Sequence, residues 1–164
     1  MNTSTSLRMI AASASVLVLA ACGGAAEGDG AAPAATDEPA AIDKRQDNFE
    51  AIGDAFKTIR EQLEGTPDLA LIETSANDIN KRAERISSLF PEGSGMDAGH
   101  DTEALATIWE QPEEFAAATQ KLVDASADLA ATAAAGDAAA LGDKAKAMGA
   151  TCGGCHDKFR VDDD

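Results

Sequence analysis

Residues 141–159 read LGDKAKAMGATCGGCHDKF, and this stretch decides the fold that the rest of the chain completes. Its apolar side chains recur in steps of three and four residues, a spacing that places them on one face of a helix. They are Leu141, Ala145, Met148, Cys152, Cys155 and Phe159. Asp137 precedes the run and is expected to cap it, because an aspartate can accept hydrogen bonds from the first free amides of a helix. The segment therefore predicts an amphipathic helix with two cysteines on its buried face.

Three earlier runs have the same apolar spacing. The first ends at Gly65, the second opens at Pro67, and the third extends from Pro112 to Gly136. A glycine-rich loop at 91–101 (PEGSGMDAGHD) and a short apolar segment separate the second run from the third. The periodic positions are Phe49, Ile52, Phe56, Ile59 and Leu63, then Leu69, Ile72, Ala76, Ile79, Ala83, Ile86 and Phe90, then Phe115, Ala118, Leu122, Ala125, Leu129 and Ala133. Four amphipathic helices with short links within each pair predict an all-α, antiparallel up-down-up-down four-helix bundle.

The pentapeptide Cys152-Gly153-Gly154-Cys155-His156 carries the chemistry. Two thiols three residues apart, with a histidine directly after the second, form the attachment signature of a c-type haem. On one helical face both thiols can add to the vinyl groups of a single porphyrin while His156 points its imidazole at the iron. Both cysteines occupy core positions, so we expect the porphyrin to lie inside the bundle near its end.

Two other interpretations of these cysteines are weaker. A thioredoxin-like dithiol needs no histidine at this position and is expected in a βαβ setting, which the sequence does not indicate. A zinc site needs four ligands, and only His100 and Cys22 remain to complete one.

The N-terminus predicts export, which covalent haem attachment requires. Arg8 precedes an apolar run at 9–21 (MIAASASVLVLAA) that has the length of a signal peptide and is too short for a stable membrane span. The run ends in Leu19-Ala20-Ala21-Cys22-Gly23, which resembles the lipobox of bacterial lipoproteins, in which the cysteine becomes the lipidated first residue. We expect a periplasmic protein anchored through Cys22, with the outer membrane as a candidate because Gly23 is not aspartate. The alternative is ordinary cleavage that leaves Cys22 as a free thiol.

Composition divides the rest of the chain. Residues 22–41 are rich in glycine, alanine, proline and acidic residues without an apolar period, so they predict a flexible tether before a single domain at 42–164. Without residues 1–21 the chain has 12 basic and 29 acidic side chains, a formal charge of −17 (12 − 29). This charge argues against nucleic acid and against adhesion to anionic lipid. The negative charge is compatible with a redox partner that has a basic surface. It is equally compatible with an acidic, solvated exterior that binds no partner.

From about Ile42 to Arg160 the chain resembles cytochrome c′, a class II c-type cytochrome. The matching stretches are 45–53 (RQDNFEAIG), 89–93 (LFPEG), 108–109 (IW) and 150–160 (ATCGGCHDKFR). The resemblance implies one covalent haem c with Cys152 and Cys155 as thioether anchors and His156 as the proximal iron ligand.

The same resemblance implies haem contacts for residues far from the motif: Arg45, Gln46, Phe49, Thr102 and Glu103. Arg45 and Gln46 would approach the propionates, Phe49 would cover the distal face of the iron, and Thr102 and Glu103 would border the haem edge. Arg160 matches a basic residue one turn after the proximal histidine. From spacing alone, Arg45 is also compatible with a solvated charge, and Phe49 with an ordinary core position.

One histidine ligand leaves the iron an open coordination position. In low-spin relatives of this family a methionine at the Phe49 position fills it, and phenylalanine cannot. We therefore expect a five-coordinate, high-spin haem that binds NO or CO, transfers single electrons, or does both. The alternative is a dedicated electron-transfer cytochrome with a six-coordinate low-spin haem, for which His100 or Met96 would supply the ligand.

A haem enzyme such as a peroxidase is disfavoured, because the first helix has no distal histidine to act as an acid–base group. The prediction is therefore a protein that is not an enzyme. A homodimer, common in the family, remains open. We expect Trp109 to be a packing residue and His100 to lie in a surface loop.

Overall fold

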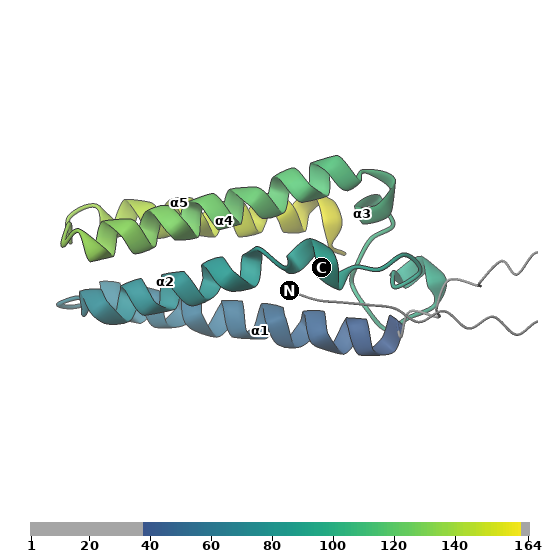
Figure 1. The fold of residues 1–164 in the computed structure, drawn as a ribbon, viewed down its shortest axis with the longest axis horizontal. Coiled ribbons are helices and arrows are strands. Elements are labelled where there is room, and N and C mark those ends of the chain that lie inside the picture. The colour runs from purple at the N-terminus through teal and green to yellow at the C-terminus, as the bar shows by residue number, and fades with distance from the viewer. Residues whose placement is uncertain (1–37, 162–164) are drawn as a thin grey trace, which may run out of the picture. The chain divides into compact units, whose positions relative to one another are not determined.

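The computed structural model describes residues 38–161, which form four long helices and three short ones (Figure 1). α1 (Glu38–Leu63) pairs with α2 (Leu69–Ala83), and α4 (Pro112–Ala134) pairs with α5 (Leu141–Phe159). The predicted all-α four-helix bundle is confirmed. Within the described residues, no helix has the length and apolarity needed to cross a membrane. The predicted signal peptide, Cys22 and most of the predicted tether lie outside these residues.

The first helix begins earlier than the apolar pattern indicates. α1 starts at Glu38, inside the stretch predicted to be tether, and Ile42 is already buried. Ala40 and Ala41 have high helix propensity, and Pro39 falls in the first turn, where proline is tolerated. The periodic pattern marks only the apolar residues that face the core, so it could not detect this polar first turn.

The second predicted run is not one helix. Asp68 caps α2 by accepting hydrogen bonds from the amides of Ala70 and Leu71, both at 3.1 Å, but α2 ends at Ala83. A 3₁₀ turn, η1 (Ile86–Leu89), follows it and still buries Ile86. Over a single turn, periods of 3.0 and 3.6 residues differ by less than one position, so the spacing could not distinguish them.

The second helix pair also differs in detail from the prediction. α5 begins at Leu141, and the residue before it, Ala140, provides no side-chain cap. Asp137 instead accepts a hydrogen bond from the Ala140 amide (3.3 Å) within the preceding turn, so the predicted capping of the helix by Asp137 is wrong. Gly136 adopts φ +77°, a left-handed conformation suited to glycine, which turns the chain after α4.

The buried face of α4 is rotated slightly from the predicted one. Thr119 and Ser126 are buried, whereas the predicted Ala118 and Ala125 are half-buried. Ser126 donates to the Leu122 carbonyl at 2.7 Å, so burial of its hydroxyl leaves no unsatisfied donor.

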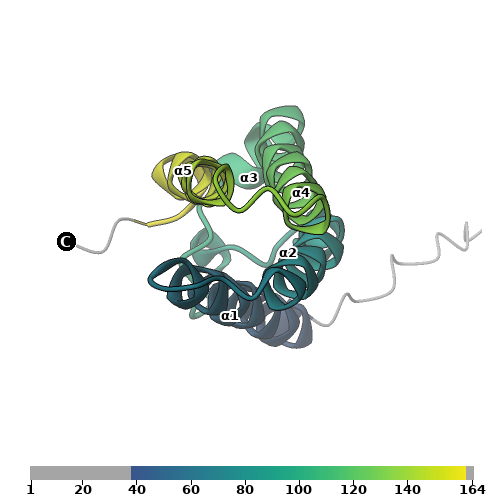
Figure 2. The same ribbon diagram turned by 90° about the vertical axis from the view of Figure 1, so that its left-hand side faces the viewer.

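The four helices do not pack equally well against one another. α2 packs closely against α1 and α4, and α4 against α5, whereas α1 and α5 make few contacts (Figure 2). A loop with the short helices η2 (Met96–Ala98) and α3 (Thr107–Glu110) joins the two pairs. The space between α1 and α5 holds the candidate site.

Candidate haem site

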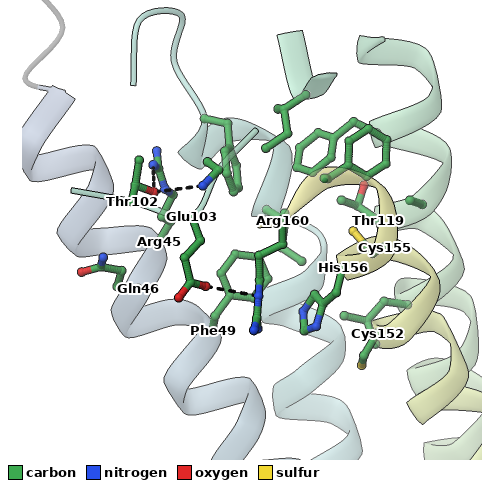
Figure 3. Close-up of a pocket in the computed structure, with 18 of the residues that line it drawn as sticks. Arg45, Gln46, Phe49, Thr102, Glu103, Thr119, Cys152, Cys155, His156 and Arg160 are labelled. Atoms are coloured by element: carbon green, nitrogen blue, oxygen red, sulfur yellow. Dashed lines mark hydrogen bonds and ion pairs between the residues drawn. The ribbon is translucent and has the colours of Figure 1, made fainter. Parts of the chain in front are cut away.

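A cavity of about 620 Å³ lies between α1, α4, α5 and the loop at 101–104 (Figure 3). We call it the α1–α5 cavity. Its volume is within the range of about 300–1,000 Å³ typical of small-molecule and cofactor sites. All eight residues that the sequence associates with haem line it: Arg45, Gln46, Phe49, Thr102, Glu103, Cys152, Cys155 and His156.

One wall comes from the last turns of α5. Cys152 and Cys155 are half-buried, and burial raises the pKa of both thiols. The imidazole of His156 is exposed toward the open side, where partial desolvation and the nearby positive charge of Arg160 lower its pKa. A lowered pKa keeps this imidazole neutral at pH 7, the form whose nitrogen lone pair can bind a metal.

The facing wall is apolar and comes from Phe49 of α1, from η1 and the residue that follows it, and from α4. The Phe49 ring contacts the Phe90 ring edge-on, with centroids 6.3 Å apart, and Phe90 contacts Phe115 at 5.0 Å. Phe49 remains 36% exposed, so it is not the fully packed core residue that its periodic position suggests. Its exposure arises because α1 has no close partner helix on this side.

Arg45 is buried, with only 3% of its surface exposed, which rules out a solvated charge. Its guanidinium donates to Ser94 Oγ (2.8 Å), to the Ser94 carbonyl (2.7 Å) and to Thr102 Oγ1 (2.6 Å), and lies 4.8 Å from the centroid of the Phe90 ring. Burial lowers the pKa of Arg45. These hydrogen bonds all go to neutral groups, so an anionic group entering the cavity would be stabilised by the guanidinium.

The loop at the cavity edge is tied to the end of α5. Glu103 forms an ion pair with Arg160 (Oε2 to Nε, 3.2 Å; Figure 3). The Val161 amide donates to the Glu103 carbonyl at 2.9 Å. Thr102, the next residue back, accepts the hydrogen bond from Arg45. The two edge residues therefore connect α1 to the chain that follows the cysteine motif.

Taken together, the residues fit a haem c. Two thiols and a neutral histidine share one helical face, an apolar wall suits the macrocycle, and a buried guanidinium suits its carboxylates.

Comparison with known proteins agrees with this geometry. The family model described as Cytochrome C' matches residues 40–160. The chain belongs to the cytochrome c′ family. Members of this family are haem proteins that carry one covalent haem c and are not enzymes, and the chain is a haem protein of this kind.

The relatives cover most of the chain. The cytochrome c′ of Rhodospirillum rubrum is 37% identical over 131 residues, which is 78% of this chain and 86% of the relative. The crystal structure of cytochrome c′ from Thermochromatium tepidum is 26% identical, with a TM-score of 0.70, and covers 77% of this chain and 98% of its own. A third cytochrome c′, described as having an unusual ligand-controlled dimer dissociation, is 28% identical, with a TM-score of 0.71, over 79% of this chain and all of its own.

The candidate sixth ligands lie away from the cytochrome c′ cavity. Met96 is 46% exposed and His100 is half-buried in the loop, and neither lines the α1–α5 cavity. Among the described residues that do line it, His156 is the only histidine, and there is no methionine. Nowhere in the described part of the chain do three His, Cys, Asp or Glu residues gather closely enough to hold a metal ion by themselves.

Several wall residues were recognised in the sequence only as core positions, or not at all. They are Ile86, Phe90, Ile108, Phe115, Thr119 and Leu122. Their spacing shows that most of them face inward, but not that the bundle opens beside them. Trp109 packs as expected, and its indole nitrogen donates to the carbonyls of Phe90 and Pro91, both at 3.1 Å.

Proposed function

We propose that Cys152 and Cys155 hold the haem, that His156 is the single protein ligand of its iron, and that Phe49 covers the open coordination position. The protein then binds uncharged diatomic gases such as NO and CO, and it exchanges single electrons with a partner. The observation that carries this proposal is the makeup of the α1–α5 cavity, where a phenylalanine from α1 faces the histidine wall and no second metal-binding histidine or methionine is present among its described lining residues.

Each side chain has a defined part in this proposal. When bound, the haem supplies an iron centre that alternates between Fe(III) and Fe(II) and accepts diatomic ligands. His156 contributes a neutral imidazole, and the positive guanidinium of Arg45 stabilises the carboxylates of the haem. The rings of Phe49 and Phe90 exclude water and offer no hydrogen bond to a bound ligand. Bound dioxygen would lack a stabilising hydrogen bond at such a site, so NO and CO are favoured over dioxygen.

Electron transfer is favoured by one further observation. The side of the cavity between α1 and α5 carries the exposed imidazole of His156. A cofactor edge on this side would be close to solvent and to a docked partner, and the negative charge of the chain suits a basic one.

We also propose the cellular arrangement from the sequence alone. Residues 1–21 direct export to the periplasm, Cys22 carries the lipid, and the residues between Cys22 and the start of α1 act as a tether. A homodimer is an additional proposal, supported by the relative whose dimer dissociates under ligand control.

The optical spectrum of the purified holoprotein tests the coordination state. We expect high-spin spectra in both the ferric and ferrous forms, with CO binding to the ferrous form. Spectra that are low-spin and six-coordinate in both forms would refute the open coordination position and favour a dedicated electron carrier.

A further inference from the structure

One glycine of α5 approaches α1 closely enough that a side chain would not fit freely. A Cβ built on Gly149 would lie 3.1 Å from Cζ and 3.4 Å from Cε1 of Phe56. The other helical glycines of the described residues, Gly53, Gly142, Gly153 and Gly154, would meet nothing within 4 Å. Gly149 is therefore the position where α5 admits a ring of α1 against its backbone.

This contact matters because α1 and α5 touch so little elsewhere. The half-buried Phe56 ring packs against the core and reaches the backbone of α5 at Gly149. The contact lies just beyond the cavity-lining residues of α1 (45–50) and of α5 (151–159), at the end that we call the base of the α1–α5 cavity. A change in the space available to this ring changes the separation of the two helices.

The contact has a fixed relation to the candidate haem site. α1 and α5 are antiparallel, so a step back along α1 and a step forward along α5 lead in the same direction. Phe49 lies seven residues before Phe56, and His156 lies seven residues after Gly149. At a rise of about 1.5 Å per residue, both lie about 10 Å from the contact along their helices.

Phe49 is also held from its other side. Arg45, one turn before it, is fixed to the loop by its hydrogen bonds to Ser94 and Thr102. The segment of α1 between Arg45 and Phe56 is also held to its neighbours, because Asn48 donates to the Arg82 carbonyl (3.3 Å) and accepts from Arg85 Nε (2.9 Å). With α1 held in this way, a side chain added at Gly149 would displace α5, and with it the wall of the cavity that faces the Phe49 ring.

We infer that the contact between Phe56 and Gly149 sets the spacing of α1 and α5 at the base of the cavity, and thereby how closely Phe49 covers the iron held by His156. Phe56 and Gly149 are positioning residues, because neither lines the cavity itself. This inference rests on the proposed function, in which Phe49 limits access to the iron.

The test compares Gly149→Ala with Gly142→Ala in the holoprotein. Both replace a glycine of α5 by a better helix former, but only the first places a methyl group against Phe56. We expect Gly149→Ala to raise the CO association rate several-fold with the spectrum still high-spin, and Gly142→Ala to leave the rate unchanged. In urea, we expect Gly142→Ala to raise the unfolding midpoint more than Gly149→Ala does.

Phe56→Leu removes the ring and provides the second half of the test. If the ring transmits the effect of Gly149→Ala, the double variant Phe56→Leu/Gly149→Ala should have nearly the same CO association rate as Phe56→Leu alone. Two results would overturn the inference. One is a CO association rate of Gly149→Ala equal to that of the wild type. The other is an increase caused by Gly149→Ala that is just as large when Phe56 is already leucine. A low-spin wild-type spectrum would instead refute the proposed function, so the two failures are distinguishable.

Discussion

Replacing Phe49 by alanine tests the proposed site most directly. The ring is about two-thirds buried, since 36% of the residue is exposed. Full truncation of a buried phenylalanine costs about 3–5 kcal/mol, so a partly exposed one should cost roughly 2–3 kcal/mol of unfolding free energy. Urea denaturation of the holoprotein measures this loss.

The ligand kinetics follow from the same contact. To admit a gas molecule, the Phe49 ring must move away from Phe90, with which it makes an edge-on contact at 6.3 Å. Such aromatic pairs are worth about 0.5–1.5 kcal/mol. Removing that barrier should raise the CO association rate by about twofold to tenfold, measured after flash photolysis of the ferrous–CO protein.

Leu71→Ala is a matched control. Leu71 is an apolar residue of similar exposure, 39%, on α2 and outside the α1–α5 cavity. Its replacement should leave the CO rate unchanged. Phe49→Met should in contrast supply a sixth ligand and convert the spectrum to low-spin. An unchanged CO rate in Phe49→Ala would refute the idea that this ring restricts access to the iron.

Three further predictions concern the anchors of the haem, of the membrane attachment and of α1. Serine at both Cys152 and Cys155 should leave a haem that acid acetone extracts, and extraction from the wild type would contradict covalent attachment. Cys22→Ser should abolish labelling with radioactive palmitate and release the protein from the membrane fraction, whereas an unlabelled, soluble wild type would favour ordinary signal cleavage. Arg45→Gln should lower the unfolding free energy by roughly 2–3 kcal/mol, because hydrogen bonds from a charged donor to Ser94 are lost. A urea midpoint equal to that of the wild type would show that the buried guanidinium does not stabilise the loop.

The sequence by itself determined the fold class and the chemistry. Helical periodicity is a property of one segment and can be read without knowing its neighbours, which is why four amphipathic runs predicted the bundle. The motif at Cys152, Cys155 and His156 is equally local, because three residues within two helical turns share a face whatever packs against them. The other five residues associated with haem, which line the same cavity, came from the family resemblance and not from periodicity: Arg45, Gln46, Phe49, Thr102 and Glu103.

The tertiary structure decided everything that depends on distances between helices. Spacing could not reveal that α1 and α5 separate and leave a cavity, that Arg45 is buried among neutral partners, or that Phe49 stays partly exposed. It also could not pair Gly149 with Phe56, because nothing local connects a glycine of the last helix with a ring of the first. These features arise when packing of the whole bundle fixes which surfaces meet, and a sequence pattern records only which surface of each helix is apolar.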